Sequence, residues 1–356
     1  MEVACVMQFE TRSSFSVVKI TVLSVLLAAG TTLCAEECSQ LDILKAQRNG
    51  AAFDVTLKVV DDKGDPVEGA LCEGWKWIDA HKDNGSSYET VTDSNGLARV
   101  TGKCGKWVSV AVSKEGYYSS QDEIRFSGLK KKGVLGSYEW QPYGSDVRVV
   151  LKRIHKPCRL IHDDGSPKNL PKLGEWIGYD LELNQWVKPY GDGRCSDMLV
   201  RVCIDALNDI SDFKTSMEVS FTNCPYAGAY KQSMDSHSDM RSTYSADTNA
   251  LYQSSLFFKH ERHAIAGVNG IAGTDTRLDD KSYLVFRTRT EVDDRGRLVS
   301  AHYGKIDGLW EFFGSMRAAS ISFNPIPNDT NLEDLETAER SRRDYRHQQE
   351  MRKNRK

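Results

Sequence analysis

The sequence lacks the short motifs that identify several common enzyme classes. It contains no G-x-S-x-G nucleophile elbow, no Walker A run and no C-x-x-C pair. The stretch KHERH, at 259–263, misses the H-E-x-x-H spacing of zinc proteases by one position, and the glycines of 267–273 do not form the G-x-G-x-x-G of a dinucleotide fold. We therefore predict no nucleotide, thioredoxin-like or zinc-ribbon site, and we expect no cofactor.

A strong charge of either sign is also missing. The net charge is −3 and the isoelectric point is near 6.3, so we expect no nucleic-acid partner. With 40% hydrophobic and 27% charged residues among 356, the chain has the composition of a globular protein of about two domains. Its 50 acidic residues leave open a glycoside hydrolase with a facing carboxylate pair, because such a pair is defined by distance and not by sequence.

Long apolar runs are absent after the first 35 residues, so we expect no transmembrane span in the mature chain. The N-terminal run, residues 20–30, follows Arg12 and Lys19 and precedes Leu33-Cys-Ala35. Basic residues, a short apolar core and a small residue are typical of a secretory signal peptide, predicted here as residues 1–35. A retained membrane anchor is the alternative. We expect a secreted, periplasmic or cell-envelope-associated protein.

Nine cysteines are present, and Cys5 and Cys34 lie within the predicted signal peptide. The remaining seven are an odd number, so at least one is free, lost or paired with another chain. Because an exported protein meets an oxidising compartment, we expect some of them to pair, and we predict a disulfide between Cys72 and Cys104. Two buried free thiols are the alternative.

Residues 53–154, which follow a predicted linker at 36–52, carry the alternation of half-buried strands. Apolar and polar side chains alternate in FDVTLKV, from residue 53, and in VSVAV, from residue 108. Turn sequences such as DSNG at 93–96 separate these runs, and no helical period appears. The pattern predicts a β-sandwich domain over residues 53–154.

Three pieces of this region occur in the order typical of the carboxypeptidase regulatory-like domain, an Ig-like β-sandwich of the prealbumin type. They are VVDDKGDPVEGA (59–70), TDSNGLARV (92–100) and VSVAVSKEGY (108–117), and the region resembles that family. It departs from the family in a longer, tryptophan-bearing stretch between Leu71 and Val91. The resemblance implies a sandwich architecture and a mostly non-catalytic role, as a binding platform, spacer or folding partner.

Residues 155–330 are predicted as a second β-rich domain, and residues 331–356 as a charged tail, helical or disordered. Strands are expected at 198–204, 217–222, 283–292, 298–306 and 318–323. Pieces of this half resemble a group of uncharacterised secreted bacterial proteins, which implies export from a bacterium but no activity; these pieces are 178–193, 298–308 and 323–333. The expected fold is all-β, with two tandem β-sandwich-like domains behind the signal peptide.

The stretch GYDLELNQWVKPYGDG, residues 178–193, is rich in both aromatic and acidic side chains. It reads as a hairpin with its turn at Asn184-Gln185. In YDLEL, at 179–183, the tyrosine and the leucines are expected to face the core and the two acids to face water. The directions of Trp186 and Tyr190 stay open.

Two sets of residues are candidate ligand sites. Aromatic rings stack on sugar rings, and the candidate carbohydrate contacts are Trp75, Trp77, Trp186 and Tyr190, with Trp176 and Trp310 as further tryptophans. In an extended strand three alternating polar residues would face one side and could hold a metal ion, namely Asp235, His237 and Asp239. The small polar residues around this second set are more typical of a solvated loop.

The sequence therefore predicts a secreted or cell-envelope β-sandwich protein that is non-catalytic and binds or scaffolds. Its partner is expected to be a polysaccharide or another envelope protein. The alternatives are a carbohydrate-binding protein that uses exposed aromatic rings and a glycoside hydrolase-like enzyme. Exposed rings favour the first, and a pocket with facing acids would favour the second.

Overall fold

The computed structural model describes residues 38–79, 84–132, 137–163, 166–209, 211–234, 236–265, 271–279, 281–313 and 315–355. The predicted signal peptide, residues 1–35, lies outside these ranges, and so does Asp235. Within them, no helix combines the length and the apolar character needed to cross a bilayer.

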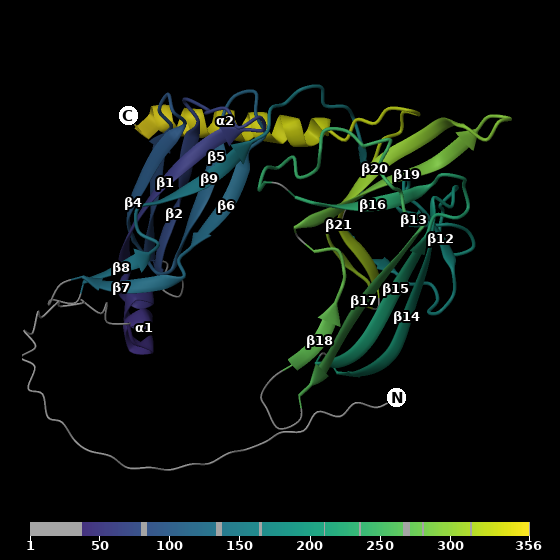
Figure 1. Cartoon of the computed structure of the whole chain (residues 1–356), viewed down its shortest axis with the longest axis horizontal. Helices are drawn as coiled ribbons and strands as arrows, with labels where there is room; N and C mark the ends of the chain where they lie inside the picture. Colours follow the sequence, from purple (N-terminus) through teal and green to yellow (C-terminus); the bar gives the residue numbers. More distant parts are fainter. Residues whose placement is uncertain are drawn as a thin grey trace, which may run out of the picture. The chain divides into compact units, whose positions relative to one another are not determined.

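Two sheets are formed by the first half of the chain (Figure 1). The first runs β4 (Leu97–Cys104), β1 (Ala51–Asp61), β8 (Ser137–Gln141) and β7 (Gly128–Lys132), and β9 (Ser145–Leu151) also pairs with β1. The second runs β3 (Asn84–Val91), β2 (Leu71–Asp79), β5 (Trp107–Ser113) and β6 (Ser120–Arg125).

The inner faces of these two sheets share one hydrophobic core. On β5 the valines at 108, 110 and 112 are buried, while Trp107, Ser109 and Ala111 face outward, as the period of a strand requires. Phe53, Val55 and other alternate residues of β1 meet those valines in the same cluster. The first half is therefore a β-sandwich, called here the first sandwich.

The second half contributes another pair of packed sheets. One contains β10 (Ile161–His162), β21 (Ser315–Phe323), β20 (Leu298–Glu311), β19 (Ser282–Val292) and β16 (Gly228–Ser233), with β11 (Lys168–Asn169) on β21. The other contains β13 (Gln185–Trp186), β12 (Ile177–Asp180), β14 (Met198–Asp209), β15 (Asp212–Ser220), β17 (Ser255–Ala264) and β18 (Ile271–Asp275). Their core joins residues of both sheets, such as Met217 and Phe286.

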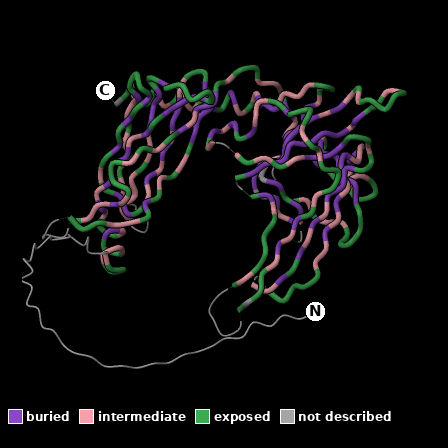
Figure 2. The backbone as a smooth tube through the Cα atoms, viewed as in Figure 1, coloured by how far each residue is buried: buried purple, intermediate pink, exposed green. Residues whose placement is uncertain are grey.

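The all-β prediction is confirmed: the described residues form several mainly antiparallel sheets stacked in sandwiches. Figure 2 shows the buried residues running along the strands of both sheet pairs. The predicted hairpin of 283–292 and 298–306 is present as β19 and β20, with Tyr283 opposite Asp307.

The stretch 36–52, expected as a linker, contains helix α1 (Gln40–Asn49) and the first residues of β1. A capping box starts the helix, because Ser39 Oγ accepts from Asp42 N and the Asp42 carboxylate accepts from Ser39 N. Ala46 of α1 is buried in the core of the first sandwich. A helix this short, with one buried residue, leaves no clear apolar period in the sequence.

The charged tail contains helix α2 (Leu335–Arg355). Asp334 caps it by accepting from Thr337 N at 2.7 Å. Ala338 packs in a small buried cluster with Tyr118 and Met240. Farther along, Gln348 Nε2 donates to the carboxylate of Glu73 on β2 at 2.7 Å. This helix, which has no apolar stripe, is held by one alanine and by polar contacts.

The predicted disulfide between Cys72 and Cys104 is absent, and both cysteines are free and buried. The N–H of Gly105 bonds to the carbonyl of Trp77, which sets Cys104 beside the far end of β2. Cys72 lies five residues earlier on that strand, about 16 Å away at roughly 3.3 Å per residue, whereas a disulfide needs Cα atoms within about 7 Å. Burial raises the pKa of each thiol to about 12.

Candidate functional site

Trp186 is buried, so its prediction as a carbohydrate contact is wrong. Only 5% of the residue is exposed, and its ring meets Tyr179 edge-on with centroids 5.0 Å apart. Its Nε1 donates to the carbonyl of Asn169 at 2.8 Å. Trp310 is also buried, at 1%. A ring enclosed by the core cannot stack on a sugar in solvent.

Trp75 and Trp77 lie two residues apart on β2 and share its outer face. Their ring centroids are 5.6 Å apart, and Trp75 is 36% exposed. Trp107, on the outer face of β5, adds a third ring 5.8 Å from that of Trp77. We call these three residues the tryptophan row. Sequence reasoning missed Trp107, although its place just before buried Val108 indicates an outward side chain.

Small residues beside the tryptophan row keep this sheet face open. Ser87 is opposite Trp75 on β3, and Gly85 is opposite Trp77. A Cβ at Gly85 would come within 2.2 Å of Trp75 Nε1, so the absence of a side chain leaves room for the indole. The residues opposite the row on β3 therefore leave Trp75 exposed, while Trp77 and Trp107 are half-buried.

On the other side of the row, β6 continues the same face with polar side chains. Arg125 is opposite Trp107, Glu123 opposite Ser109 and Gln121 opposite Ala111. Because side chains opposite one another in a ladder point to the same face, these three face outward with Trp107. Arg125 and Glu123 form an ion pair.

An open groove of about 740 Å³ lies along this polar part of the face. Its lining includes Ser109, Ala111, Glu123, Arg125, His237 and Lys281. A second hollow of about 460 Å³ is lined in part by Gln121, Ser238, Asp239 and Arg241. The two share Gln121, His237 and Lys281, and we call them together the β6 groove.

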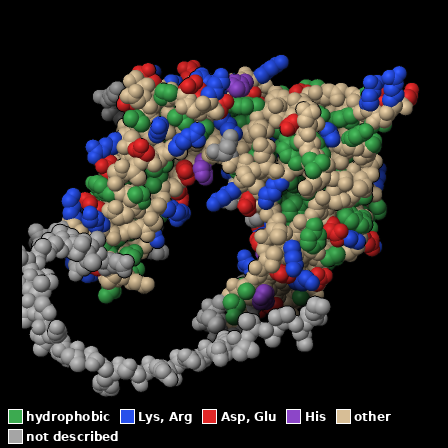
Figure 3. All heavy atoms as spheres, viewed as in Figure 1, with side chains coloured by type: hydrophobic (Ala, Val, Ile, Leu, Met, Phe, Trp, Pro, Cys, Tyr) green, Lys and Arg blue, Asp and Glu red, His purple; other side chains and the backbone are tan. Residues whose placement is uncertain are grey.

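The wall of the β6 groove comes from the loop after β16. Gln121 N donates to the carbonyl of His237 at 3.1 Å, and Asp239 N donates to that of Ser119 at 2.8 Å. The segment 237–239 is therefore bonded to the edge of β6 like a short extra strand. Figure 3 shows acidic and basic side chains interspersed over the face of the molecule that it presents.

Of the predicted metal ligands, His237 and Asp239 have separate partners. Asp235 lies outside the described residues. His237 Nε2 is 3.7 Å from a carboxylate oxygen of Asp122, whereas Asp239 accepts from Ser341 Oγ at 3.2 Å. Burial raises the pKa of Asp239. Among the described residues, no group of three His, Cys, Asp or Glu side chains is arranged to hold a metal ion.

Asp180 is buried, although the hairpin pattern predicted that it faces water. The hairpin itself is present: Tyr179 pairs with Trp186 around a turn at 181–184. Asp180 Oδ1 accepts from the N–H groups of Glu182 and Leu183, each at 3.0 Å. Its Oδ2 accepts from two further N–H groups, those of residues 194 and 195. Leu183, expected in the core, is 38% exposed.

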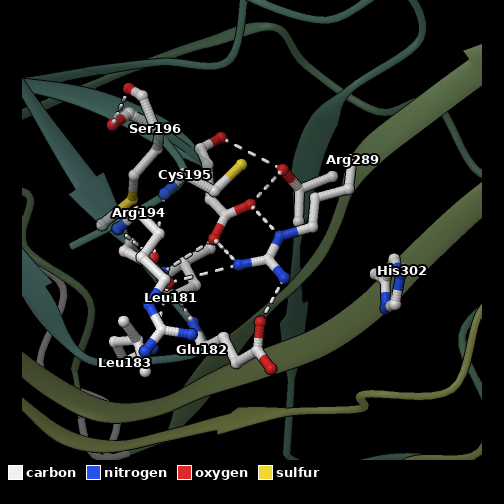
Figure 4. Close-up of polar contacts among 12 residues, drawn as sticks. Leu181, Glu182, Leu183, Arg194, Cys195, Ser196, Arg289 and His302 are labelled. Carbon is white, nitrogen blue, oxygen red and sulfur yellow. Dashed lines mark hydrogen bonds and ion pairs between the residues drawn. The ribbon is translucent and has the colours of Figure 1, made fainter. Parts of the chain in front are cut away.

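Arg289 joins three carboxylates at this hairpin (Figure 4). Its Nε and Nη2 contact the two oxygens of Asp197 at 2.9 and 3.0 Å, and Nη2 reaches Asp180 at 3.2 Å. Nη1 donates to Glu182. Burial alone would raise the pKa of Asp180, but its backbone N–H partners and Arg289 hold the pKa below the ordinary 3.8.

The carboxylates of the Arg289 cluster do not form a hydrolase pair. Asp180 and Asp197 are each about 1% exposed, and both are bound to one arginine. A glycosidase needs a general acid that reaches the substrate. The cluster is therefore a structural clamp between the hairpin and β19.

A serine, a histidine and an aspartate also meet at one point of the second half. His162 Nδ1 is 3.1 Å from Ser322 Oγ, and His162 Nε2 is 2.8 Å from Asp334 Oδ1. Ser322 is 1% exposed and is the cross-strand neighbour of His162. A nucleophile must reach its substrate, so this arrangement does not form an open hydrolase site.

Tyr190 is 38% exposed but lies on the hairpin of the second half and not on the sheet face of the tryptophan row. Of the predicted aromatic contacts, the structure thus brings together Trp75 and Trp77, adds Trp107, and separates Trp186 and Tyr190 from them.

Comparison with known proteins gives no family: no family model matches the chain, and no curated protein matches it. Among solved structures, 3-chlorocatechol 1,2-dioxygenase from Rhodococcus opacus matches at 14% identity and a TM-score of 0.24, over 30% of this chain and 62% of that chain. Catechol 1,2-dioxygenase from Acinetobacter matches at 15% identity and a TM-score of 0.23, over 30% of this chain and 54% of that chain.

A "putative carbohydrate binding protein" from Bacteroides uniformis matches at 9% identity and a TM-score of 0.17, over 79% of this chain and 100% of that chain. This chain spans less than two thirds of the two dioxygenase chains named above. At such TM-scores none of these likenesses carries an argument about function.

Proposed function

We propose that the protein is an exported, non-catalytic binding protein that holds a polysaccharide on the tryptophan row and in the β6 groove. The observation that carries the proposal is that Trp75, Trp77 and Trp107 lie together on the outer face of one sheet, Trp75 exposed and the other two half-buried, beside an open polar groove. Export follows from the predicted signal peptide, and it would place the protein where polysaccharides occur.

The chemistry of this face suits sugars. Aromatic rings pack against the C–H faces of a pyranose, and an indole N–H adds a donor at the edge. Beside them, the amide of Gln121, the carboxylate of Glu123 and the guanidinium of Arg125 provide planar groups that hydrogen-bond to hydroxyls. Stacking rings and planar polar groups meet on one face.

The angles between the tryptophan rings indicate which kind of polysaccharide they can bind. Trp75 and Trp77 are inclined by 51° to each other, and Trp77 and Trp107 by 40°. Such rings do not form a flat platform, so they fit a crystalline polysaccharide surface poorly. A single soluble chain, whose successive sugar units turn relative to one another, can follow them.

The test is a glycan array followed by calorimetry on the best ligand, with the mature chain and two variants. Trp75→Ala and Trp77→Ala together should weaken binding about tenfold or more, because each stacked ring contributes roughly 1 kcal/mol. Trp176→Ala is the matched control, since Trp176 is 42% exposed but lies in the second half, next to Arg201.

Trp176→Ala should leave the affinity unchanged. Absence of any glycan ligand, or an unchanged affinity in the Trp75 and Trp77 variant, would overturn the proposal. Circular dichroism and a thermal melt show whether each variant is folded.

A further inference from the structure

We propose that the β6 groove is selective for an acidic sugar and that Lys281 and Arg241 bind the carboxylate of a uronic acid unit. This inference rests on the proposed polysaccharide binding and specifies its ligand. One sugar unit stacks on the tryptophan row while an acidic unit lies in the smaller hollow of the groove.

The charges in the groove favour an anion. Arg125 is paired with Glu123, and His237 lies near Asp122. Lys281 and Arg241 both line the smaller hollow and are exposed, and neither side chain forms an ion pair with a described residue. Lys281 and Arg241 are therefore the cations of the smaller hollow without a close ion pair among the described residues, and the charge of Arg241 also interacts with the carboxylate of Asp239.

Asp239 also lines the smaller hollow, and its carboxylate interacts with the charges of Arg340 and Arg241. Its Oδ2 accepts from Ser341 Oγ on α2 at 3.2 Å, so the carboxylate is engaged on the helix side. Arginine binds a carboxylate through two parallel N–H groups, and lysine adds a point charge. Together they would hold an anion of carboxylate size at the rim of the hollow.

The main chain holds both cations next to β6. Met234 N donates to the carbonyl of Lys281 at 2.8 Å, which ties the end of β16 to the start of β19. Gln121 N donates to His237 O and fixes the loop that leads to Arg241. The anion subsite is thus attached to the floor of the groove by backbone hydrogen bonds.

Strand β6, which forms the floor of the groove, connects the smaller hollow to the tryptophan row. Gln121, at the hollow, and Arg125, opposite Trp107, are four residues apart on β6, about 13 Å at roughly 3.3 Å per residue. This length exceeds one sugar ring. The ligand is therefore an oligosaccharide segment with its acidic unit at the Gln121 end.

The experiment compares a polyuronate, polygalacturonate, with its carboxyl-reduced neutral form by calorimetry. The wild-type chain should bind the acidic polymer about tenfold more tightly than the neutral one. The double variant Lys281→Gln, Arg241→Gln should bring this ratio close to one and reduce the salt dependence of binding to the acidic polymer.

The control variant is Lys63→Gln, Arg295→Gln, which removes the same charge from two exposed turn residues outside the groove. It should keep the acidic preference. The inference is overturned if the wild-type chain binds both polymers equally, if the double variant keeps the preference, or if only sulfated glycans or acidic peptides bind.

Failure of the proposed polysaccharide binding would give a different result from failure of the acidic-sugar inference. It would show as no binding of either polymer, or as unchanged binding of both by the Trp75→Ala, Trp77→Ala variant. A variant that binds both polymers but no longer prefers the acidic one has lost the contribution of Lys281 and Arg241. A variant that binds neither polymer has lost the contribution of the tryptophan row.

Discussion

The tryptophan row and the hairpin at 178–193 look alike in sequence but differ in the structure. Both combine tryptophan with acidic residues and glycine. On β2 and β5 the rings remain at the surface, because the inner faces of these strands already fill the core of the first sandwich. In the hairpin, Trp186 is part of the core and the acids bind Arg289.

This difference shows that aromatic and acidic content does not by itself identify a binding site. What matters is which face of the strand meets a second sheet and whether the polar groups are already bonded. Asp180 accepts hydrogen bonds from four backbone N–H groups, so it has little capacity left for a ligand. On the face of the tryptophan row, the rings and part of the charged groups remain available to a ligand.

The largest expected effect is that of Arg289→Met. It leaves two buried carboxylates without their cation, and breaking such a cluster costs about 3–5 kcal/mol of unfolding free energy. Urea denaturation followed by tryptophan fluorescence measures this change. The control is Arg125→Met, whose ion pair is exposed and should contribute less than about 1 kcal/mol. Equal effects of the two substitutions would remove the contrast between the hairpin and the tryptophan row.

The next effect is that of Asp180→Asn, about 1–3 kcal/mol at neutral pH, because the backbone N–H groups lose a charged acceptor. The folded pKa of Asp180 lies below 3.8, so its contribution is complete above about pH 5 and is lost as the pH falls through the folded pKa. Denaturation curves from pH 7 to pH 2 should therefore converge for variant and wild type at the acid end. A constant difference down to pH 2 would contradict the role of the charge.

A smaller effect is expected from Trp186→Phe. The change removes the hydrogen bond from Nε1 to Asn169 and part of a buried ring, which costs about 1–2 kcal/mol. Thermal and urea unfolding measure it. Glycan binding should stay at the wild-type level. A loss of affinity without a loss of stability would show that Trp186 contacts the glycan.

The smallest effect on stability is expected from Trp75→Ala, within about 0.5 kcal/mol, because the ring is partly exposed. Its effect should be on ligand binding. A stability loss comparable to that of Trp186→Phe would mean that the tryptophan row serves the fold.

Much of the fold could be predicted from alternation. The strand at 198–204 lies in β14, that at 217–222 overlaps β15, and β19 and β20 pair over the expected strands 283–292 and 298–306. The Arg289 cluster could not be predicted, because Arg289 follows Asp197 by 92 residues and reaches it from a bulge of β19 with a φ of 49°. Nothing in a local pattern indicates such a contact.

The candidate site was predicted only in part. Trp75 and Trp77 were identified, whereas Trp107 belongs to another strand and joins them through sheet pairing. The β6 groove was missed because its floor and its wall come from residues more than a hundred positions apart. Distances of that kind are set by packing and leave no periodic signal.

The sequence by itself determined the all-β architecture, because alternation of apolar and polar side chains is a local consequence of the strand geometry. It also indicated Trp75 and Trp77 as candidate carbohydrate contacts. Only the tertiary structure decided that Trp75 stays exposed while Trp186 and Asp180 are enclosed. Burial depends on which second sheet covers a strand, and that partner comes from a distant part of the chain.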